Sequence, residues 1–201
     1  MEQYHNVKIE KIETLYKANW LQLNKISFTD SKNKIRSWES VDRTTKKGDT
    51  DGVDIIAIVN KDSQRHLICV LQFRAPIGKL SLEFPAGLVD GDESAEVSAN
   101  RELLEETGYT SKSVCHVSPT PMSLEPGLSS ANTRYVIINV KEELLQPQQH
   151  LEENELIEVL LIPLDSNIAD RLNKIAIERN CQISSQLYAF ALGLSFQTIF
   201  S

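Results

Sequence analysis

Three glutamates lie close together in the stretch from Gly87 to Tyr109, which reads GLVDGDESAEVSANRELLEETGY. Glu102, Glu105 and Glu106 fall within two turns of a predicted helix, where Glu102 and Glu106 share one face. Like charges at this spacing destabilise a helix by about 0.2–0.5 kcal/mol per pair. A bound cation would reverse that repulsion, and ligands that are all oxygens favour Mg²⁺ or Mn²⁺ over zinc. The spacing therefore indicates a divalent-metal site.

A solvated acidic helix face is the alternative, and the three glutamates alone would favour it. The flanking residues favour the metal site instead. Ser94 has N-cap character at the start of a predicted helix over 94–107, and Gly108 ends that helix. A predicted strand over 80–84 leads into a tight exit at 85–87, which would bring backbone carbonyls beside the carboxylates. Strand, glycine loop and helix together predict several oxygen donors on rigid elements.

Elements along the chain predict an α/β fold, an α/β/α sandwich with a mixed sheet and helices on both faces. Val97 and Leu104, opposite the glutamates, predict an apolar face on the first helix. A β-segment over 1–50 precedes the main domain over 51–201, with a polar linker at 46–52. The β-prone runs are 20–23, 35–41, 53–60, 67–73, 79–84, 135–140 and 156–162, and the predicted helices are 94–107, 167–178 and 185–196.

Composition is typical of a soluble enzyme with a small-molecule substrate. The 201 residues can bury a core in one main domain, and the net charge of −7 argues against nucleic acid or an anionic membrane as partner. No apolar segment follows Met1, and the apolar run at 156–164 is too short to span a bilayer. The three cysteines and four histidines show no metal or nucleophile spacing. We expect a cytoplasmic location, with the nucleus as a second compartment left open.

Aromatic and charged residues near the N-terminus are candidates for substrate binding. Trp20 and Trp38 are either core aromatics of a small β-layer or stacking platforms for a purine, at about 1–3 kcal/mol per base. The run from Trp38 to Arg43 favours stacking, because it adds the acceptor Glu39 and a cation that can grip phosphate. Arg74, after the strand over 67–73, offers a second phosphate clamp.

The spacing G-x5-E-x7-R-E-L-x-E-E-x-G from Gly87 to Gly108 resembles the signature of the Nudix hydrolases at every fixed position. The resemblance implies a loop–helix–loop that holds divalent metal against a diphosphate linked to another moiety. It implies that the metal ligands are Glu102, Glu106 and the Ala86 carbonyl. It also implies that Arg101 forms a structural ion pair with Glu93. In its terms the catalytic groups are Glu155, Glu105 and Arg101.

Outside this signature the chain resembles the ADP-ribose and ADP-sugar pyrophosphatase branch, particularly its eukaryotic members. The likeness lies in the two tryptophans and in the runs WESVDRTTKK, QFRAP, EFPAGLVD and EPGLS. It implies a homodimer with exchanged N-terminal β-segments, in which Trp20 and Trp38 of different subunits sandwich adenine. The other implied substrate contacts are Glu39 and Arg43 for the nucleotide, Arg74 for the diphosphate, and Leu88 and Glu125 near the terminal ribose. Human-type members carry Asp in place of Glu125, which leaves the preferred sugar open.

The hypothesis that follows is hydrolysis of ADP-ribose to AMP and ribose 5-phosphate with two or three Mg²⁺ ions, Mn²⁺ being a possible substitute. A metal-activated water would attack one phosphorus in line, with Arg74 stabilising the developing charge. By resemblance Glu155, in the acidic loop 152–155, is the base; the alternative is a solvated loop glutamate. Two other readings stay open, namely a Nudix enzyme for another nucleoside diphosphate derivative such as an oxidised nucleotide, and a non-catalytic nucleotide sensor.

Overall fold

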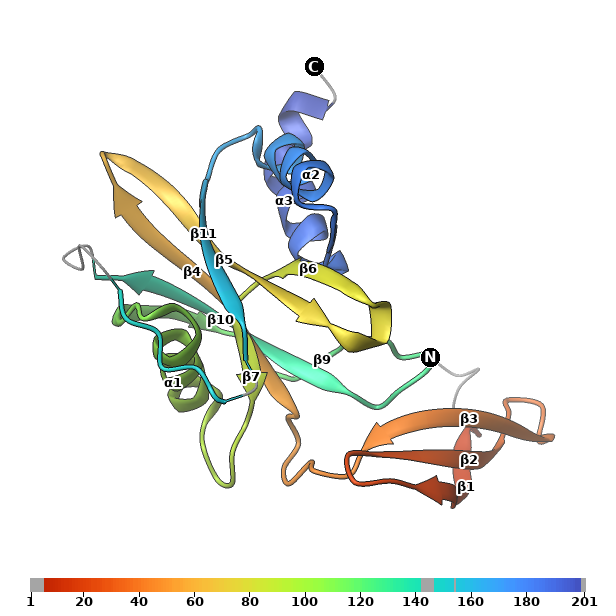
Figure 1. Cartoon of the computed structure of the whole chain (residues 1–201). Coiled ribbons are helices and arrows are strands. Elements are labelled where there is room, and N and C mark those ends of the chain that lie inside the picture. The colour runs from red at the N-terminus through yellow and green to blue at the C-terminus, as the bar shows by residue number, and fades with distance from the viewer. Residues whose placement is uncertain (1–5, 142–146, 154, 200–201) are drawn as a thin grey trace. The chain divides into compact units, whose positions relative to one another are not determined.

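The structure is a computed structural model that describes residues 6–141, 147–153 and 155–199 (Figure 1). The chain divides into two compact units. The first consists of Met1–Asp51 together with Thr120–Thr133, and the second of Gly52–Pro119 together with Arg134–Ser201. The segment 120–133 therefore belongs with the N-terminal residues although it lies far from them in sequence.

The first unit contains a three-stranded antiparallel sheet in the order β1-β2-β3. The strands are β1 (Lys8–Lys17), β2 (Leu21–Thr29) and β3 (Ile35–Arg43). Between β2 and β3 the register is regular, and their turn is closed by Asp30, whose carboxylate accepts from the backbone N–H groups of Lys32 and Lys34. The predicted β-prone runs 20–23 and 35–41 lie largely in β2 and β3. The sequence analysis did not predict β1, whose alternation is broken by two register shifts.

Burial in the first unit is inverted relative to an ordinary globular domain. In the described part of this unit the buried residues are all polar: Asn24, Ser40, Thr50, Asp51 and Thr133. Large hydrophobic side chains of the same unit are exposed: Val7, Ile9, Ile12, Leu15, Tyr16, Trp20, Leu21, Leu23, Ile35, Trp38, Met122, Leu124 and Leu128. A sheet of this kind has no hydrophobic face packed within its own unit.

The main sheet has the order β12-β6-β5-β4-β10-β8, with β11 beside β5, β7 beside β4 and β9 beside β10. β6 pairs with β12 in parallel and with β5 in antiparallel, so the sheet is mixed. Its strands are β4 (Gly52–Lys61), β5 (Gln64–Arg74), β6 (Lys79–Glu83), β7 (Ala86–Leu88), β8 (Ser111–Val117), β9 (Met122–Ser123), β10 (Asn132–Val140), β11 (Ile157–Pro163) and β12 (Cys181–Ile183). A short 3-10 turn, η2 (Ala75–Ile77), joins β5 to β6.

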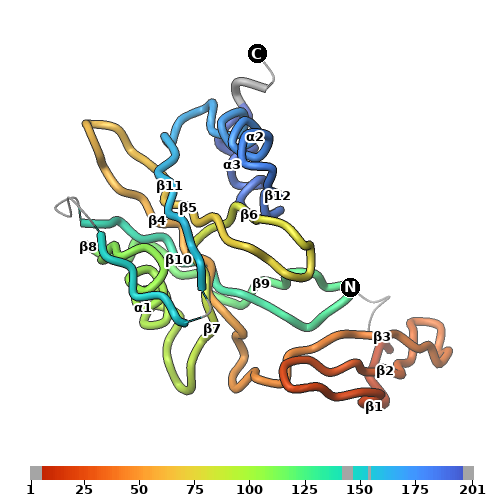
Figure 2. Tube along the Cα trace, viewed as in Figure 1, coloured from red at the N-terminus to blue at the C-terminus, as the bar shows by residue number. Residues whose placement is uncertain are grey.

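Helices cover both faces of the sheet in the second unit (Figure 2). The helix α1 (Ala95–Thr107) packs in one hydrophobic cluster with Ile55 and Ile138. The other two helices, α2 (Ile168–Arg179) and α3 (Ser185–Ile199), share the second cluster with alternate residues of β5. The predicted sandwich with a mixed sheet and three helices is confirmed. None of the described helices is long and apolar enough to cross a membrane.

The predicted apolar face of α1 is wrong. Val97 is 52% exposed and Leu104 is also exposed, whereas the buried residues are Ser98, Ala99, Leu103, Glu106 and Thr107. The helix therefore turns a glutamate toward the sheet and two hydrophobic side chains toward solvent. Packing of the preceding loop against α1 decides this orientation, since a helix with few apolar residues has no strong preference of its own.

Candidate active site

The acidic helix begins and ends where local capping places it. The Ser94 hydroxyl accepts from the backbone N–H of Val97, and Gly108 adopts a left-handed conformation at φ 73°. Between β7 and α1 the backbone approaches the helix closely. A Cβ added to Gly87 would lie 1.9 Å from Cδ of Glu102, so only glycine fits beside that carboxylate.

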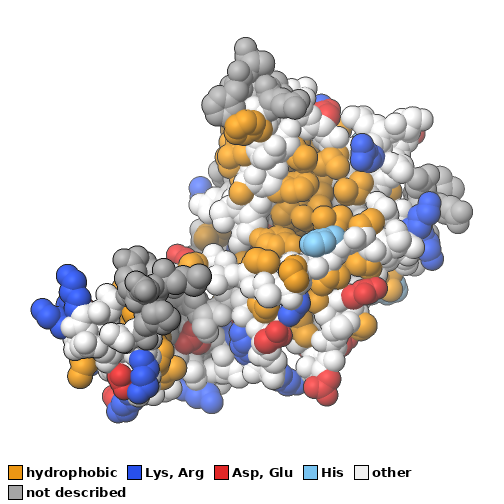
Figure 3. Space-filling view, turned by 180° about the vertical axis from the view of Figure 1, so that it is seen from behind, with side chains coloured by type: hydrophobic (Ala, Val, Ile, Leu, Met, Phe, Trp, Pro, Cys, Tyr) orange, Lys and Arg blue, Asp and Glu red, His pale blue; other side chains and the backbone are white. Residues whose placement is uncertain are grey.

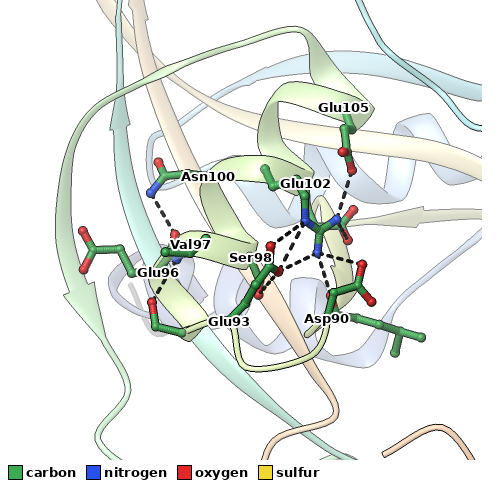
Figure 4. A network of polar contacts seen from close by, with 11 residues as sticks. Asp90, Glu93, Glu96, Val97, Ser98, Asn100, Glu102 and Glu105 are labelled. Atoms are coloured by element: carbon green, nitrogen blue, oxygen red, sulfur yellow. Dashed lines mark hydrogen bonds and ion pairs between the residues drawn. The ribbon is translucent and has the colours of Figure 1, made fainter. Parts of the chain in front are cut away.

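Arg101 is the centre of an ion-pair network formed by carboxylates from α1 and the loop before it. Figure 4 labels the acidic partners Asp90, Glu93, Glu102 and Glu105. Its Nη2 donates to Glu93 at 3.0 Å and to the Leu88 carbonyl at 3.0 Å. Its Nη1 donates to Glu102 at 2.7 Å and to Glu105 at 3.1 Å. The predicted Arg101–Glu93 ion pair is thus confirmed, and the contacts raise the pKa of the guanidinium. Arg101 fixes the loop to the helix.

Glu106 is a buried carboxylate, and Glu102 is half-buried. Glu106 is 3% exposed, and its Oε2 accepts from the Ala86 N–H at 2.9 Å. Burial raises the pKa of Glu106 to about 8, against the opposing effect of that hydrogen bond. Burial likewise raises the pKa of Glu102 to about 7, although Arg101 acts in the other direction. Each carboxylate is therefore held in a position where its charged form is disfavoured until a cation compensates it.

The three glutamates of the signature do not converge on one point. Among residues 6–141, 147–153 and 155–199, no group of three or more His, Cys, Asp or Glu side chains is arranged to hold a metal ion. Glu102 and Glu105 both turn to Arg101, while Glu106 turns to the backbone of Ala86. Each carboxylate thus accepts from a nearby donor that stabilises its charge.

Arg74 and Glu155 extend this site beyond the helix. Arg74 donates to Glu83 through Nε at 3.1 Å and Nη2 at 2.7 Å. The hydrogen bond with Glu83 raises the pKa of Arg74 most, and the charges of Glu106 and Glu155 raise it further. The charge of Glu155 also raises the pKa of Glu102 and Glu106. The structure therefore brings the predicted base into electrostatic range of the predicted metal ligands. Asn154, in the same acidic loop, lies outside the described residues.

A segment that the sequence analysis left unassigned connects α1 to the Glu155 loop. Nε2 of Gln149 donates to the carbonyls of Glu106 at 2.6 Å and Ile157 at 3.0 Å. The N–H of His150 donates to the Glu105 carbonyl at 2.8 Å. Gln149 thereby links the end of the acidic helix to the first residue of β11, two positions after Glu155. Only the three-dimensional pairing reveals this role, because the run QPQQH has no periodicity.

Glu83 was also missed as a site residue, although it lies in the quoted run EFPAGLVD. It pairs in register with Val70 on β5, four positions before Arg74, and its carboxylate accepts from the Arg74 guanidinium. The alternation of Ser81 and Glu83 along β6 was the available signal. Leu88 is exposed at the end of β7, and its carbonyl is bound by Arg101.

The predicted adenine-binding residues lie in the first unit, on β3 and the turn before β2. Trp20 is 70% exposed and Trp38 is 53% exposed, so neither is a buried core aromatic. Glu39 and Arg43 are exposed on β3. Because side chains alternate along a strand, Glu39 and Arg43 face the side opposite Trp38. Trp38, Glu39 and Arg43 thus lie on one strand, with the indole on one face and the two charged side chains on the other.

The two indoles of one chain are also far apart along the sheet. The Trp20 carbonyl accepts from Thr44, whereas Trp38 stands opposite Ile26. Thr44 lies six positions after Trp38, which corresponds to about 20 Å of extended chain. Two rings that sandwich a base lie only about 7 Å apart. The backbone positions that carry Trp20 and Trp38 in one chain are therefore well separated along the sheet.

The Glu125 loop is fastened to β3 within the first unit. Nε1 of Trp38 donates to the Gly127 carbonyl at 3.0 Å, and the Val41 N–H donates to the Leu128 carbonyl at 3.0 Å. Asp42 accepts from both the N–H and the hydroxyl of Ser130. Glu125 itself is exposed. The predicted site residues thus fall into two groups, one in each unit: Trp20, Trp38, Glu39, Arg43 and Glu125 in the first, and Arg74, Ala86, Leu88, Arg101, Glu102, Glu105, Glu106 and Glu155 in the second.

Comparison with known proteins gives a family match over most of the chain. The NUDIX domain family matches residues 49–180. A Nudix hydrolase of Schizosaccharomyces pombe, described as uncharacterized, is 41% identical over 200 residues, with 96% of each chain covered. The ADP-sugar pyrophosphatase of Mus musculus is 33% identical over 90% of this chain and 84% of its own length.

The ADP-ribose pyrophosphatase of Saccharomyces cerevisiae is 37% identical over 73% of this chain and 65% of its own length. Among solved structures, one described as an ADP compounds hydrolase superposes with a TM-score of 0.63 at 21% identity. The superposition covers 85% of this chain and 84% of the solved chain. At this identity the structural match supports the fold.

Proposed function

The chain belongs to the Nudix hydrolase family, and from this premise we propose that it hydrolyses the diphosphate of ADP-ribose and related ADP-sugars to AMP and a sugar phosphate. The observation that carries the proposal is that Glu102 and Glu106, both with raised pKa values, lie within electrostatic range of Glu155, and Glu106 also within that of Arg74. The relatives named ADP-sugar and ADP-ribose pyrophosphatase support the substrate class.

The residues present fit a divalent metal ion such as Mg²⁺, which Nudix hydrolases generally use. Glu106 is buried and Glu102 half-buried, and their raised pKa values mean that burial disfavours the charged form of each carboxylate. Gly87 leaves open the space beside Glu102 that any side chain would fill. Carboxylate oxygens together with the Ala86 carbonyl form the hard donor set that Mg²⁺ or Mn²⁺ prefers. Two to three ions per site remain part of the proposal.

In the mechanism, Glu102, Glu106 and the Ala86 carbonyl would hold the metal, which supplies charge to the diphosphate and acidifies water. Glu155 accepts the proton of the attacking water. Its charge raises the pKa of both Glu102 and Glu106, so it lies near them, and it is exposed on its loop. Arg74, oriented by its two bonds to Glu83, stabilises charge on the phosphoryl oxygens. Arg101 ties the loop to the helix through the Leu88 carbonyl, and Glu105 holds the Arg101 guanidinium from the same helix.

The proposal is tested by incubating the protein with ADP-ribose and Mg²⁺ in ¹⁸O-labelled water and measuring the masses of the products by mass spectrometry. AMP and ribose 5-phosphate, with label in one of them, are expected, and the labelled product identifies the phosphorus attacked. Parallel reactions with other ADP-sugars and with 8-oxo nucleotides distinguish the substrate classes. If no ADP-sugar releases AMP, the chain is a nucleotide sensor or serves another substrate.

We also propose that the protein is a homodimer in which each adenine site takes one indole from each chain. The first unit exposes its hydrophobic side chains and buries polar ones, as expected of a surface that is covered in an assembly. The separation of Trp20 from Trp38 within one chain supports a second copy as the source of the other indole. Hydrophobic side chains also gather on a face of the second unit (Figure 3), and Leu192, Leu194 and Phe196 of α3 are exposed.

A further inference from the structure

Gln72 occupies a position on β5 where strands lie on both sides of it, β6 on one and β11 on the other. The register with both neighbours is continuous, so side chains alternate regularly between the two faces. Leu71 belongs to the hydrophobic cluster of α2 and α3, and Ile68 to the cluster of α1. Gln72 and Arg74 therefore share the α1 face of the sheet with Ile68.

The amide nitrogen of Gln72 is buried without a hydrogen-bond partner. Nε2 is the one buried side-chain nitrogen or oxygen without a partner in the part of the chain that the structure describes. Buried polar groups in folded proteins are almost always paired, and an unpaired donor opposes folding. A donor that stays unpaired beside a site is explained when a ligand supplies the acceptor.

The surroundings of Gln72 indicate what kind of acceptor this is. Arg74, two residues further along β5, donates two hydrogen bonds to Glu83. The charges of Glu106 and Glu155 raise the pKa of Arg74. A neutral amide donor on the same face can bind an anionic oxygen without adding a competing cation for those carboxylates. Phosphoryl oxygens held near Arg74 are acceptors of this type.

We propose that Nε2 of Gln72 donates a hydrogen bond to a non-bridging phosphoryl oxygen of the bound diphosphate, on the face of β5 that carries Arg74. This inference rests on the proposed function, because it takes the diphosphate of an ADP-sugar as the ligand. It adds a substrate-binding residue from the middle of the sheet to those of the helix and loops.

Gln72→Met tests the inference, because methionine keeps the length and shape of the side chain and removes the amide. Calorimetry in Mg²⁺ measures the affinity of the protein for the non-hydrolysable α,β-methylene analogue of ADP-ribose. The affinity should fall about 10- to 100-fold, and kcat/KM for ADP-ribose should fall by a similar factor. The melting midpoint of the free variant should equal or exceed that of the parent, since the unpaired donor is gone. If Gln72→Met fails to fold, Gln72→Leu replaces it.

Gln64→Met is the matched control, since Gln64 is exposed at the other end of β5, and it should leave affinity and midpoint unchanged. Parental affinity in Gln72→Met overturns the inference and leaves the proposed function intact. Weaker binding together with a lowered midpoint of the free protein assigns Gln72 a structural role and also overturns it. A parent that neither binds the analogue nor releases AMP refutes the proposed function, and the inference falls with it.

Discussion

The carboxylates of Glu102 and Glu106 are unusual because burial raises their pKa values although each accepts a hydrogen bond. Their pKa values of about 7 and about 8 lie far above that of an exposed glutamate, and burial is the main cause in both cases. Both depend on the close approach of the loop at 85–87 to α1. Carboxyl groups with pKa values raised in this way are typical of functional sites.

Glu106→Gln should lower turnover of ADP-ribose by about 100-fold or more, because an amide replaces the most buried of the proposed metal ligands. Calorimetric titration with Mg²⁺ should show weakened metal binding in the same variant. Glu96→Gln is the matched control, since Glu96 is exposed on the first turn of the same helix. Parental turnover and parental metal binding in Glu106→Gln would refute the assignment.

The metal-free protein should lose stability as the pH rises from about 5 to about 8. In this window the folded state still holds protons on Glu102 and Glu106 that the unfolded state has already released, so unfolding becomes easier at each step. The combined loss is on the order of a few kcal/mol. Urea midpoints measured in EDTA across this range check it, and Mg²⁺ should restore the midpoint at pH 8. A midpoint that is flat in pH contradicts the burial of these charges.

Glu155→Gln should reduce kcat by about 100- to 10,000-fold and leave the affinity for the non-hydrolysable analogue near that of the parent. The reason is that an amide of the same shape cannot accept the proton of the attacking water. Single-turnover measurements separate the two quantities. Glu153→Gln, an exposed neighbour in the same loop, should behave as the parent does. Equal losses in both variants would mean that only the charge of the loop matters.

At the scale of elements, the site depends on three pieces of backbone that meet at the end of the acidic helix. The turn into β7 touches Glu102, Arg101 ties the following loop to α1, and Gln149 ties α1 to β11. Each contact joins residues that are separated along the chain. The precision of the site therefore comes from how the elements are held together as well as from the helix.

Gly87→Ala should lower activity by about 10- to 100-fold, because the new Cβ would occupy the position of the Glu102 carboxylate and force it to move. The melting midpoint should change little, because the Cβ meets only the end of the Glu102 side chain, which can move without the backbone. Gly48→Ala provides the control, as a Cβ at Gly48 meets nothing within 4 Å. Full activity in Gly87→Ala would show that the Glu102 position is not critical.

How far the sequence predicts this arrangement follows from the range of each interaction. The ends of α1 were predictable because Ser94 and Gly108 act within one turn of the helix. The buried face of α1 was not, since it depends on the loop and sheet that pack against it. Gln72 and Gln149 carry no local signal, and their positions follow only from strand register and from pairing over long sequence distances. The Nudix signature predicted which residues gather, and tertiary contacts decide how they are held.

At the scale of the whole molecule, the two units differ in how they satisfy their surfaces. The second unit buries two hydrophobic clusters, one on each face of its sheet. The first unit buries a network of polar residues centred on Asn24 and Asp42. A unit without an apolar core of its own needs another surface for stability, and a second copy of the chain provides one in the proposed dimer.

Mixing two inactive variants tests that dimer. Trp20→Ala and Trp38→Ala should each abolish tight adenine binding. If each site takes Trp20 from one chain and Trp38 from the other, co-refolded mixtures regain about a quarter of parental activity, because half of the dimers carry one intact site. Light scattering confirms the mass of the mixed species. Mixtures that stay as inactive as the single variants would place both indoles of a site on the same chain, or outside the site.

The many partners of Arg101 have a practical consequence for genetic screens of this chain. Replacing it releases Glu93, Glu102 and Glu105 at once and frees the Leu88 carbonyl, so the lesion spreads over the loop and the first turns of α1. A screen that scores only lost turnover would rank this arginine with the groups that touch the diphosphate. Protease sensitivity of the loop, measured together with turnover, distinguishes loss of the loop structure from loss of a group that contacts the diphosphate.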